Sequence, residues 1–109
     1  MKIKIHNDVW KVKLVDANAK KMNPDPNSYN FGLTEYKELL ISIMDGRSES
    51  VTRSTLIHEL VHAFLFSYGH TVEGEEAMCD FFGVHGDEII DLTNQIIGRW
   101  GDRCLQSKK

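Results

Sequence analysis

The sequence predicts an α+β domain in which a small sheet precedes a group of helices. The first part of the chain contains short β-rich runs of alternating polarity, and from Val51 onward apolar residues recur at helical spacing. Strands and helices are therefore segregated along the chain, as in α+β folds. The chain has 109 residues, which is enough for one domain, and we expect a single domain over residues 1–109.

Three strands are expected in the first part of the chain, and together they favour a small, mostly antiparallel sheet. They cover residues 9–15, 31–36 and 38–44, which are rich in β-branched, aromatic and alternating apolar residues. Residues 23–27, with the sequence NPDPN, predict a loop between the first two strands. A short helix is possible just before that loop, over residues 17–22.

A long helix is expected next. Ser48 or Ser50 can cap its N-terminus, because a serine hydroxyl accepts hydrogen bonds from unpaired backbone N–H groups. Apolar residues recur at helical spacing over Val51–Tyr68, and Gly69 is a natural C-terminal stop. Because the middle of this helix is apolar almost all round, we expect the helix to be largely buried.

Two further helices are expected after it. One covers about 73–82 and ends at Gly83, and the other runs from about 87 to 98 or 100 with an apolar face of its own. Cys79, in the first of these helices, is expected to be a buried space-filling residue. Cys104 lies near the end of the chain, where a thiolate could in principle bind zinc and keep an enzyme latent.

Composition and charge exclude several classes of protein. Of the residues, 41% are hydrophobic and 27% charged, which is typical of a globular chain. The net charge is −3 and the lysines are scattered along the sequence, whereas nucleic-acid binding requires a clustered basic surface. The start lacks the apolar segment of a signal peptide, and no apolar run approaches the roughly 20 residues that cross a bilayer. We therefore expect a cytoplasmic protein with no nucleic-acid or membrane partner, and two cysteines are too few for a disulfide scaffold.

The segment His58-Glu59-Leu60-Val61-His62, inside the long helix, carries the chemistry. Two histidines at positions i and i+4 project from one helix face, so both imidazoles can reach one zinc ion. Glu59 lies on the flank of that face, where it can take a proton from a water molecule. We expect one catalytic zinc ion held by His58 and His62, with Glu59 as the general base. The alternative is a pair of core histidines that are hydrogen-bonded to the backbone.

A third ligand must come from elsewhere, because a catalytic zinc usually has three protein ligands and one open position. Glu76 and Asp80 lie one turn apart on the second expected helix. If their face is directed toward the zinc, Glu76 can bind the ion and Asp80 can accept the N–H of a ligand histidine. Glu73, Glu75, His70 and Asp80 are the other candidates for the third ligand. Glu75 points about 100° away from Glu76, so only one of the two can share a face with Asp80.

These segments resemble a known group of enzymes. The sequence EAMCD at residues 76–80 is similar to the E-A-x-x-D glutamate helix of thermolysin-type gluzincins, and residues 58–62 match their active-site helix. In size the chain is closer to the minigluzincins and to the small phage-associated metallopeptidases of the ImmA/IrrE type. The resemblance implies a zincin-like domain, in which residues 39–44 would form the edge strand that takes the substrate. It also implies three zinc ligands, a general base and a carboxylate that orients a ligand histidine: His58, His62 and Glu76; Glu59; and Asp80.

The expected reaction is zinc-dependent hydrolysis of a peptide bond in an extended peptide or protein substrate. If the ImmA/IrrE-type resemblance is right, that substrate is a transcriptional repressor. A further donor must stabilise the tetrahedral intermediate. The candidates for this donor are Tyr36, Tyr68, His70 and His85. The alternative function is a zinc-binding regulatory or interaction domain without hydrolytic activity, and Glu59 argues against it because structural zinc sites need no base.

Overall fold

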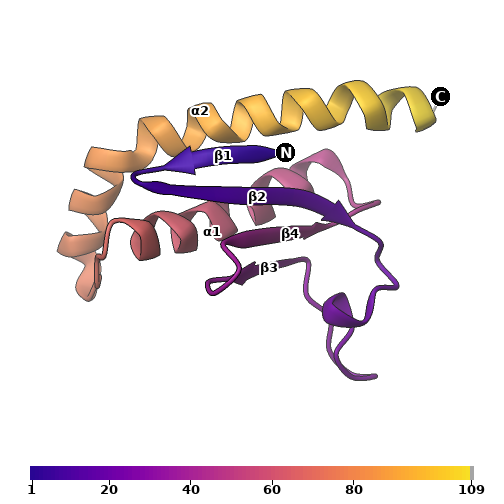
Figure 1. Cartoon of the computed structure of the whole chain (residues 1–109), viewed down its shortest axis with the longest axis horizontal. Coiled ribbons are helices and arrows are strands. Elements are labelled where there is room, and N and C mark those ends of the chain that lie inside the picture. The colour runs from indigo at the N-terminus through magenta and orange to yellow at the C-terminus, as the bar shows by residue number, and fades with distance from the viewer. Residues whose placement is uncertain (109) are drawn as a thin grey trace. The chain divides into compact units, whose positions relative to one another are not determined.

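The computed structural model describes residues 1–108, with the side chains of residues 1–101. It has the α+β architecture that the sequence predicts. The chain forms two compact units. The first covers Met1–Thr71, and the second begins at Val72. The first unit contains all the described strands together with α1 (Glu49–Ser67), and the second contains α2 (Gly74–Lys108) (Figure 1).

The sheet has four strands in the order β1-β2-β4-β3, not the three that were expected. Their bounds are β1 Lys2–Ile5, β2 Asp8–Val15, β3 Gly32–Glu35 and β4 Leu40–Met44. The additional strand, β1, forms an antiparallel hairpin with β2 through a tight turn in which His6 has a φ of 55°. A run of four alternating residues is too short to distinguish from a loop by pattern alone, which is why this strand was missed.

The expectation of a mostly antiparallel sheet was also incomplete, because the sheet is mixed. β2 pairs with β4 in parallel, with Val12 opposite Ile41, whereas β3 pairs with β4 antiparallel. β4 therefore lies in the interior of the sheet, and β3 is an edge strand. The expectation that residues 39–44 form the edge strand is wrong, because β4 has a neighbour on each side. The edge strand next to β4 is β3.

One face of the sheet carries the core of the first unit. Successive strand residues point to opposite faces, so Trp10, Val12, Ile41 and Ile43 share one face, and all four are buried. Helix α1 contacts β1, β3 and β4 (Figure 1). A hydrogen bond of 2.8 Å from Trp10 Nε1 to Ser67 Oγ places α1 against this same face.

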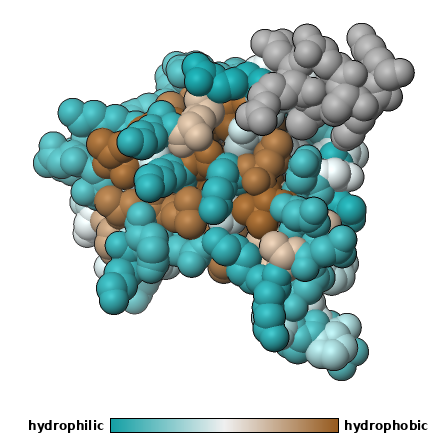
Figure 2. Space-filling model, turned by 45° about the vertical axis from the view of Figure 1, so that its right-hand side comes forward, coloured by the Kyte–Doolittle hydropathy of each residue, from teal (hydrophilic) through white to brown (hydrophobic). Residues whose placement is uncertain are grey.

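The opposite face of β1 and β2 is basic. Lys2, Lys4, Lys11 and Lys13 are all exposed, and the strand register places Lys2 directly opposite Lys11. Lysines that are scattered in the sequence are therefore gathered on one face by the hairpin. On the face of the molecule seen in Figure 2, hydrophobic areas lie between hydrophilic side chains. Within residues 1–101, the exposed large hydrophobic residues are Val9, Tyr29, Tyr36, Phe66, Phe82, Val84 and Ile90.

The connection between β2 and β3 follows the sequence prediction in part. The helix expected over 17–22 is only a short 3₁₀ turn, Lys20–Met22, and the loop expected over 23–27 is present. Asp25 organises this loop by accepting hydrogen bonds from the Ser28 hydroxyl and the Asn27 N–H. These hydrogen bonds, that of Ser28 first, hold the pKa of the Asp25 carboxyl below its ordinary value.

Helix α1 begins and ends close to where the sequence predicts. Ser48 is its N-cap, and the Ser48 hydroxyl accepts a hydrogen bond of 3.3 Å from the N–H of Val51. At the other end Gly69 has a φ of 69°, a left-handed conformation that glycine adopts without steric cost.

Helix α2 is continuous, and the division into two helices at Gly83 is wrong. Gly83 lies inside the helix without a left-handed φ, so it does not act as a C-terminal stop. A glycine costs only about 1 kcal/mol in a helix interior, and the buried positions continue past it at steps of three or four residues. These buried residues are Phe81, His85, Ile89, Thr93, Ile96 and Trp100. Among the described residues, neither helix is sufficiently long and apolar to span a bilayer.

The facing lysines of the hairpin give a stability prediction. Like charges directly opposite each other in an antiparallel pair are destabilising, so Lys11→Glu should raise the free energy of unfolding by about 0.2–1 kcal/mol. Urea unfolding measures this change, and the gain should shrink at about 1 M salt because the pair is exposed. Lys37→Glu, in the exposed β3–β4 turn, is the matched control for the change in net charge. An equal gain in both variants would contradict the pairing argument.

Candidate active site

His58 and His62 lie one turn apart in the middle of α1 and face each other. Their Nε2 atoms are 3.2 Å apart, and the ring centroids are 4.9 Å apart with the rings steeply inclined at 72°. Two nitrogens bound to one tetrahedral zinc at about 2.0–2.1 Å would be about 3.3 Å apart. The separation of the two nitrogens therefore fits two ligands of a single ion.

The burial of the motif differs from the sequence expectation. The side chain of His58 is 67% exposed, whereas that of Glu59 is only 10% exposed. α1 lies on the sheet with one side, so Leu56, Leu60 and Phe64 are buried while the histidines occupy the side away from the sheet. The helix is half-buried, not largely buried. Of the three polar residues of the motif, Glu59 is the one that is buried.

The Glu59 carboxylate lies between the helix and the edge strand β3. Its Oε1 accepts a hydrogen bond of 2.6 Å from the Thr34 hydroxyl, and its Oε2 lies 4.0 Å from His58 Nε2. A buried carboxylate is stable only when polar partners replace the water that it loses. Thr34 is such a partner, and it leaves the second oxygen of Glu59 near His58.

Gly32 allows β3 to come this close to α1. A methyl group at this position would lie 2.6 Å from Thr55 Cγ2, 2.9 Å from Glu59 Cγ and 3.0 Å from Glu59 Oε2. Real Cβ atoms do not approach other atoms so closely, so a larger residue would push the strand and the helix apart. Gly32 and Thr34 are two residues apart and so point to the same face of the strand.

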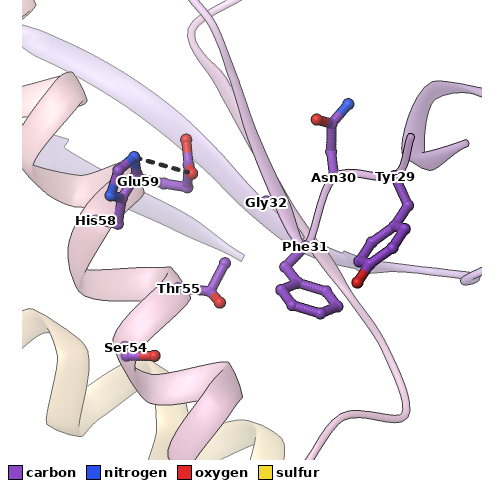
Figure 3. Close-up of a pocket in the computed structure, with 8 residues that line it drawn as sticks. All are labelled: Tyr29, Asn30, Phe31, Gly32, Ser54, Thr55, His58 and Glu59. Carbon is purple, nitrogen blue, oxygen red and sulfur yellow. Dashed lines mark ion pairs between the residues drawn. The ribbon is translucent and has the colours of Figure 1, made fainter. Parts of the chain in front are cut away.

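A pocket of about 430 Å³ adjoins the carboxylate. In Figure 3, Thr55, His58 and Glu59 of α1 face the chain that enters β3, with Phe31 and Gly32 on the opposite side. Tyr29 adds a second aromatic ring, and its centroid is 5.1 Å from that of Phe31. The volume is in the range of small ligand sites, so the pocket can accommodate part of a substrate next to Glu59.

The predicted third ligand and its neighbour belong to the second unit. Glu76 and Asp80 are both exposed and lie one turn apart near the start of α2. Glu75 and Glu76 are in the first turn, where acidic side chains also stabilise a helix through its dipole. Among residues 1–101, whose side chains the structure describes, no group of three or more His, Cys, Asp or Glu side chains is assembled around a common point. Glu76 as ligand and Asp80 as its neighbour therefore stay predictions.

The structure tests the expectation for Cys79 but not the one for Cys104. Cys79 is exposed on α2, so the expectation of a buried filler is wrong. An amphipathic helix buries only one stripe, and position 79 falls outside the stripe that contains Phe81 and His85. Cys104, the suggested latency residue, lies outside the residues whose side chains the structure describes.

Of the candidates for an oxyanion donor in the first unit, Tyr36 contacts the helix that carries the motif. Its ring packs 5.1 Å from that of Phe66, which follows His62 by one turn on the same helix face. Tyr68 instead stacks 4.5 Å from the His6 ring, and His70 lies beside Tyr68 with a centroid separation of 6.2 Å. His85 is a buried residue of the second unit.

Sequence reasoning missed Gly32 and Thr34 as site residues. The available signal was weak: a glycine inside a strand pattern indicates the close approach of another chain segment, but not which segment. We compared the chain with known protein families, with curated proteins and with solved structures, and none of them matched. The function must therefore be inferred from the chemistry of the site itself.

The close approach at Gly32 gives a second prediction. Gly32→Ala should lower the free energy of unfolding by about 1–3 kcal/mol, because the methyl group overlaps α1. Gly98→Ala is the matched control, since a methyl group there meets nothing within 4 Å and Ala favours the helix by up to about 1 kcal/mol. Chemical denaturation should thus show that the free energy of unfolding falls in Gly32→Ala and rises in Gly98→Ala. Equal stability of the Gly32→Ala variant and the parent would contradict the close packing.

Proposed function

We propose that this protein is a small zinc-dependent peptidase of the gluzincin type, with a zincin-like arrangement of its first unit. The observation that carries the proposal is the pair of Nε2 atoms 3.2 Å apart, with a buried carboxylate on the flank of the same helix turn. Structural zinc sites are closed and use no base. The Glu59 carboxylate lies beside His58 but does not hold the two histidines together, which supports a catalytic role for Glu59.

His58 and His62 would hold the ion through Nε2, with Glu76 as the proposed third ligand. A bound zinc ion would supply Lewis acidity, which lowers the pKa of water and polarises a peptide carbonyl. His58 is well exposed and also lines the pocket next to Glu59, which leaves room for a water molecule and a substrate beside the ion. Asp80 is proposed to accept the N–H of a ligand histidine and so fix the orientation of its ring.

Glu59 is the proposed general base. It takes a proton from the attacking water and later donates that proton to the nitrogen of the leaving amine. Its burial and its hydrogen bond to Thr34 hold the carboxylate in one orientation before substrate binds. Tyr36 is the favoured donor to the negatively charged oxygen of the intermediate, because its ring packs against Phe66, one turn from His62.

The substrate would be an extended peptide that adds to the free edge of β3. Edge strands present unpaired N–H and C=O groups, so a peptide can bind to them by main-chain hydrogen bonds. Such a peptide would pass over Glu59, and one of its side chains would enter the pocket that Phe31 and Thr55 line. A dedicated protein substrate such as a repressor is the proposal that follows from the ImmA/IrrE-type resemblance.

Glu59→Gln tests the proposal directly. Zinc content measured by elemental analysis should stay at one equivalent, while kcat on internally quenched peptides should fall about 100- to 10,000-fold. Glu49→Gln, an exposed position in the first turn of the same helix, is the matched control and should retain full activity. A parent protein that binds zinc tightly but hydrolyses no peptide would instead favour the regulatory or interaction domain.

A second comparison tests the third ligand. Glu76→Ala should weaken zinc affinity by more than about tenfold in a chelator competition, because loss of a ligand should exceed the effect of losing an outer partner. Glu75→Ala removes the same charge from the same helix turn and should leave zinc affinity nearly unchanged. If Glu75→Ala weakens zinc affinity more than Glu76→Ala does, the third ligand is Glu75.

A further inference from the structure

We propose that Thr34 is the residue that positions the general base, by selecting which oxygen of Glu59 is free to take a proton. This inference rests on the proposed peptidase function. It is carried by three features: a short hydrogen bond, the burial of the carboxylate, and the placement of Thr34 on the strand that also forms the substrate edge.

The hydroxyl of Thr34 has two acceptors within reach. Glu59 Oε1 lies at 2.6 Å and the Glu59 main-chain oxygen at 3.4 Å. A hydroxyl has one proton to donate, and a distance near 2.6 Å is that of an O–H donor to a carboxylate. The carboxylate oxygen therefore accepts the hydrogen bond, and the Thr34 hydroxyl keeps its proton.

This hydrogen bond makes the two oxygens of Glu59 unequal. Oε1 is held by the strand, so rotation of the carboxylate about its terminal torsion is restrained. Oε2 is the oxygen nearer the metal-binding side, at 4.0 Å from His58 Nε2. Oε2 is therefore the atom that accepts the proton from water, and Thr34 acts on the reaction only through Glu59.

The strand supplies this hydroxyl in a fixed place. Gly32 lets β3 approach α1 closely, and Thr34, two residues on, points to the same side of the strand. A β-branched side chain in a strand has restricted χ1 freedom, so the hydroxyl is held in place before substrate arrives. Serine could supply the same hydroxyl, whereas valine has nearly the same shape without it.

Thr34→Val and Thr34→Ser form the test, on the zinc-loaded full chain with a library of internally quenched hexapeptides. Thr34→Val should lower kcat about 10- to 100-fold, as expected for the loss of a hydrogen bond to a charged group, with KM and zinc affinity nearly unchanged. Thr34→Ser should restore most of kcat. Thermal melting checks folding, and valine is well tolerated in strands.

A double variant separates positioning from packing. Thr34→Val should cause no further loss of kcat in the Glu59→Gln background, because the hydroxyl acts through a carboxylate that is no longer present. Equal losses in both backgrounds would overturn the assignment, as would unchanged kcat in Thr34→Val or an equally inactive Thr34→Ser.

The parent protein distinguishes the two proposals. If the parent hydrolyses peptides and Thr34→Val is equally active, the Thr34 assignment fails while the peptidase function stands. If the zinc-loaded parent hydrolyses none of the library and no candidate protein substrate, the peptidase function fails and the role of Thr34 fails with it.

Discussion

Strand β3 runs so close to α1 that one added methyl group on Gly32 would overlap two side chains of the helix. That approach removes water from one flank of the helix and brings the Thr34 hydroxyl to the Glu59 carboxylate. Next to this carboxylate the His58 ring is exposed and the His62 ring is half-buried. The site therefore combines a buried carboxylate, that of Glu59, with imidazoles that solvent can reach. Both properties follow from how strand β3 packs on helix α1.

The parts of the fold that depend on local chemistry could be predicted from the sequence. The Ser48 cap and the left-handed Gly69 define α1, and the i, i+4 spacing brings His58 and His62 to one face. Each of these features depends on residues within a few positions of one another. The core of the candidate site is of this kind, which is why the motif could be located before any tertiary contact was known.

The features that depend on distant residues could not be predicted in the same way. The parallel pairing of β2 with β4, the edge position of β3 and the link from Thr34 to Glu59 all join segments that are far apart in sequence. Burial was misjudged for the same reason, because an apolar helix does not reveal which of its sides a sheet will cover. The continuous α2 shows the opposite error, in which a local glycine signal was overruled by the longer apolar pattern.

The mixed sheet also has a consequence for the order in which the first unit folds. β1–β2 and β3–β4 are antiparallel pairs between neighbouring strands, whereas the β2–β4 seam joins distant parts of the chain in parallel. Local pairs close with little loss of chain entropy and distant parallel pairs close slowly. In pulsed hydrogen exchange, amides of the two hairpins should become protected before those of the seam, and simultaneous protection would argue against this order.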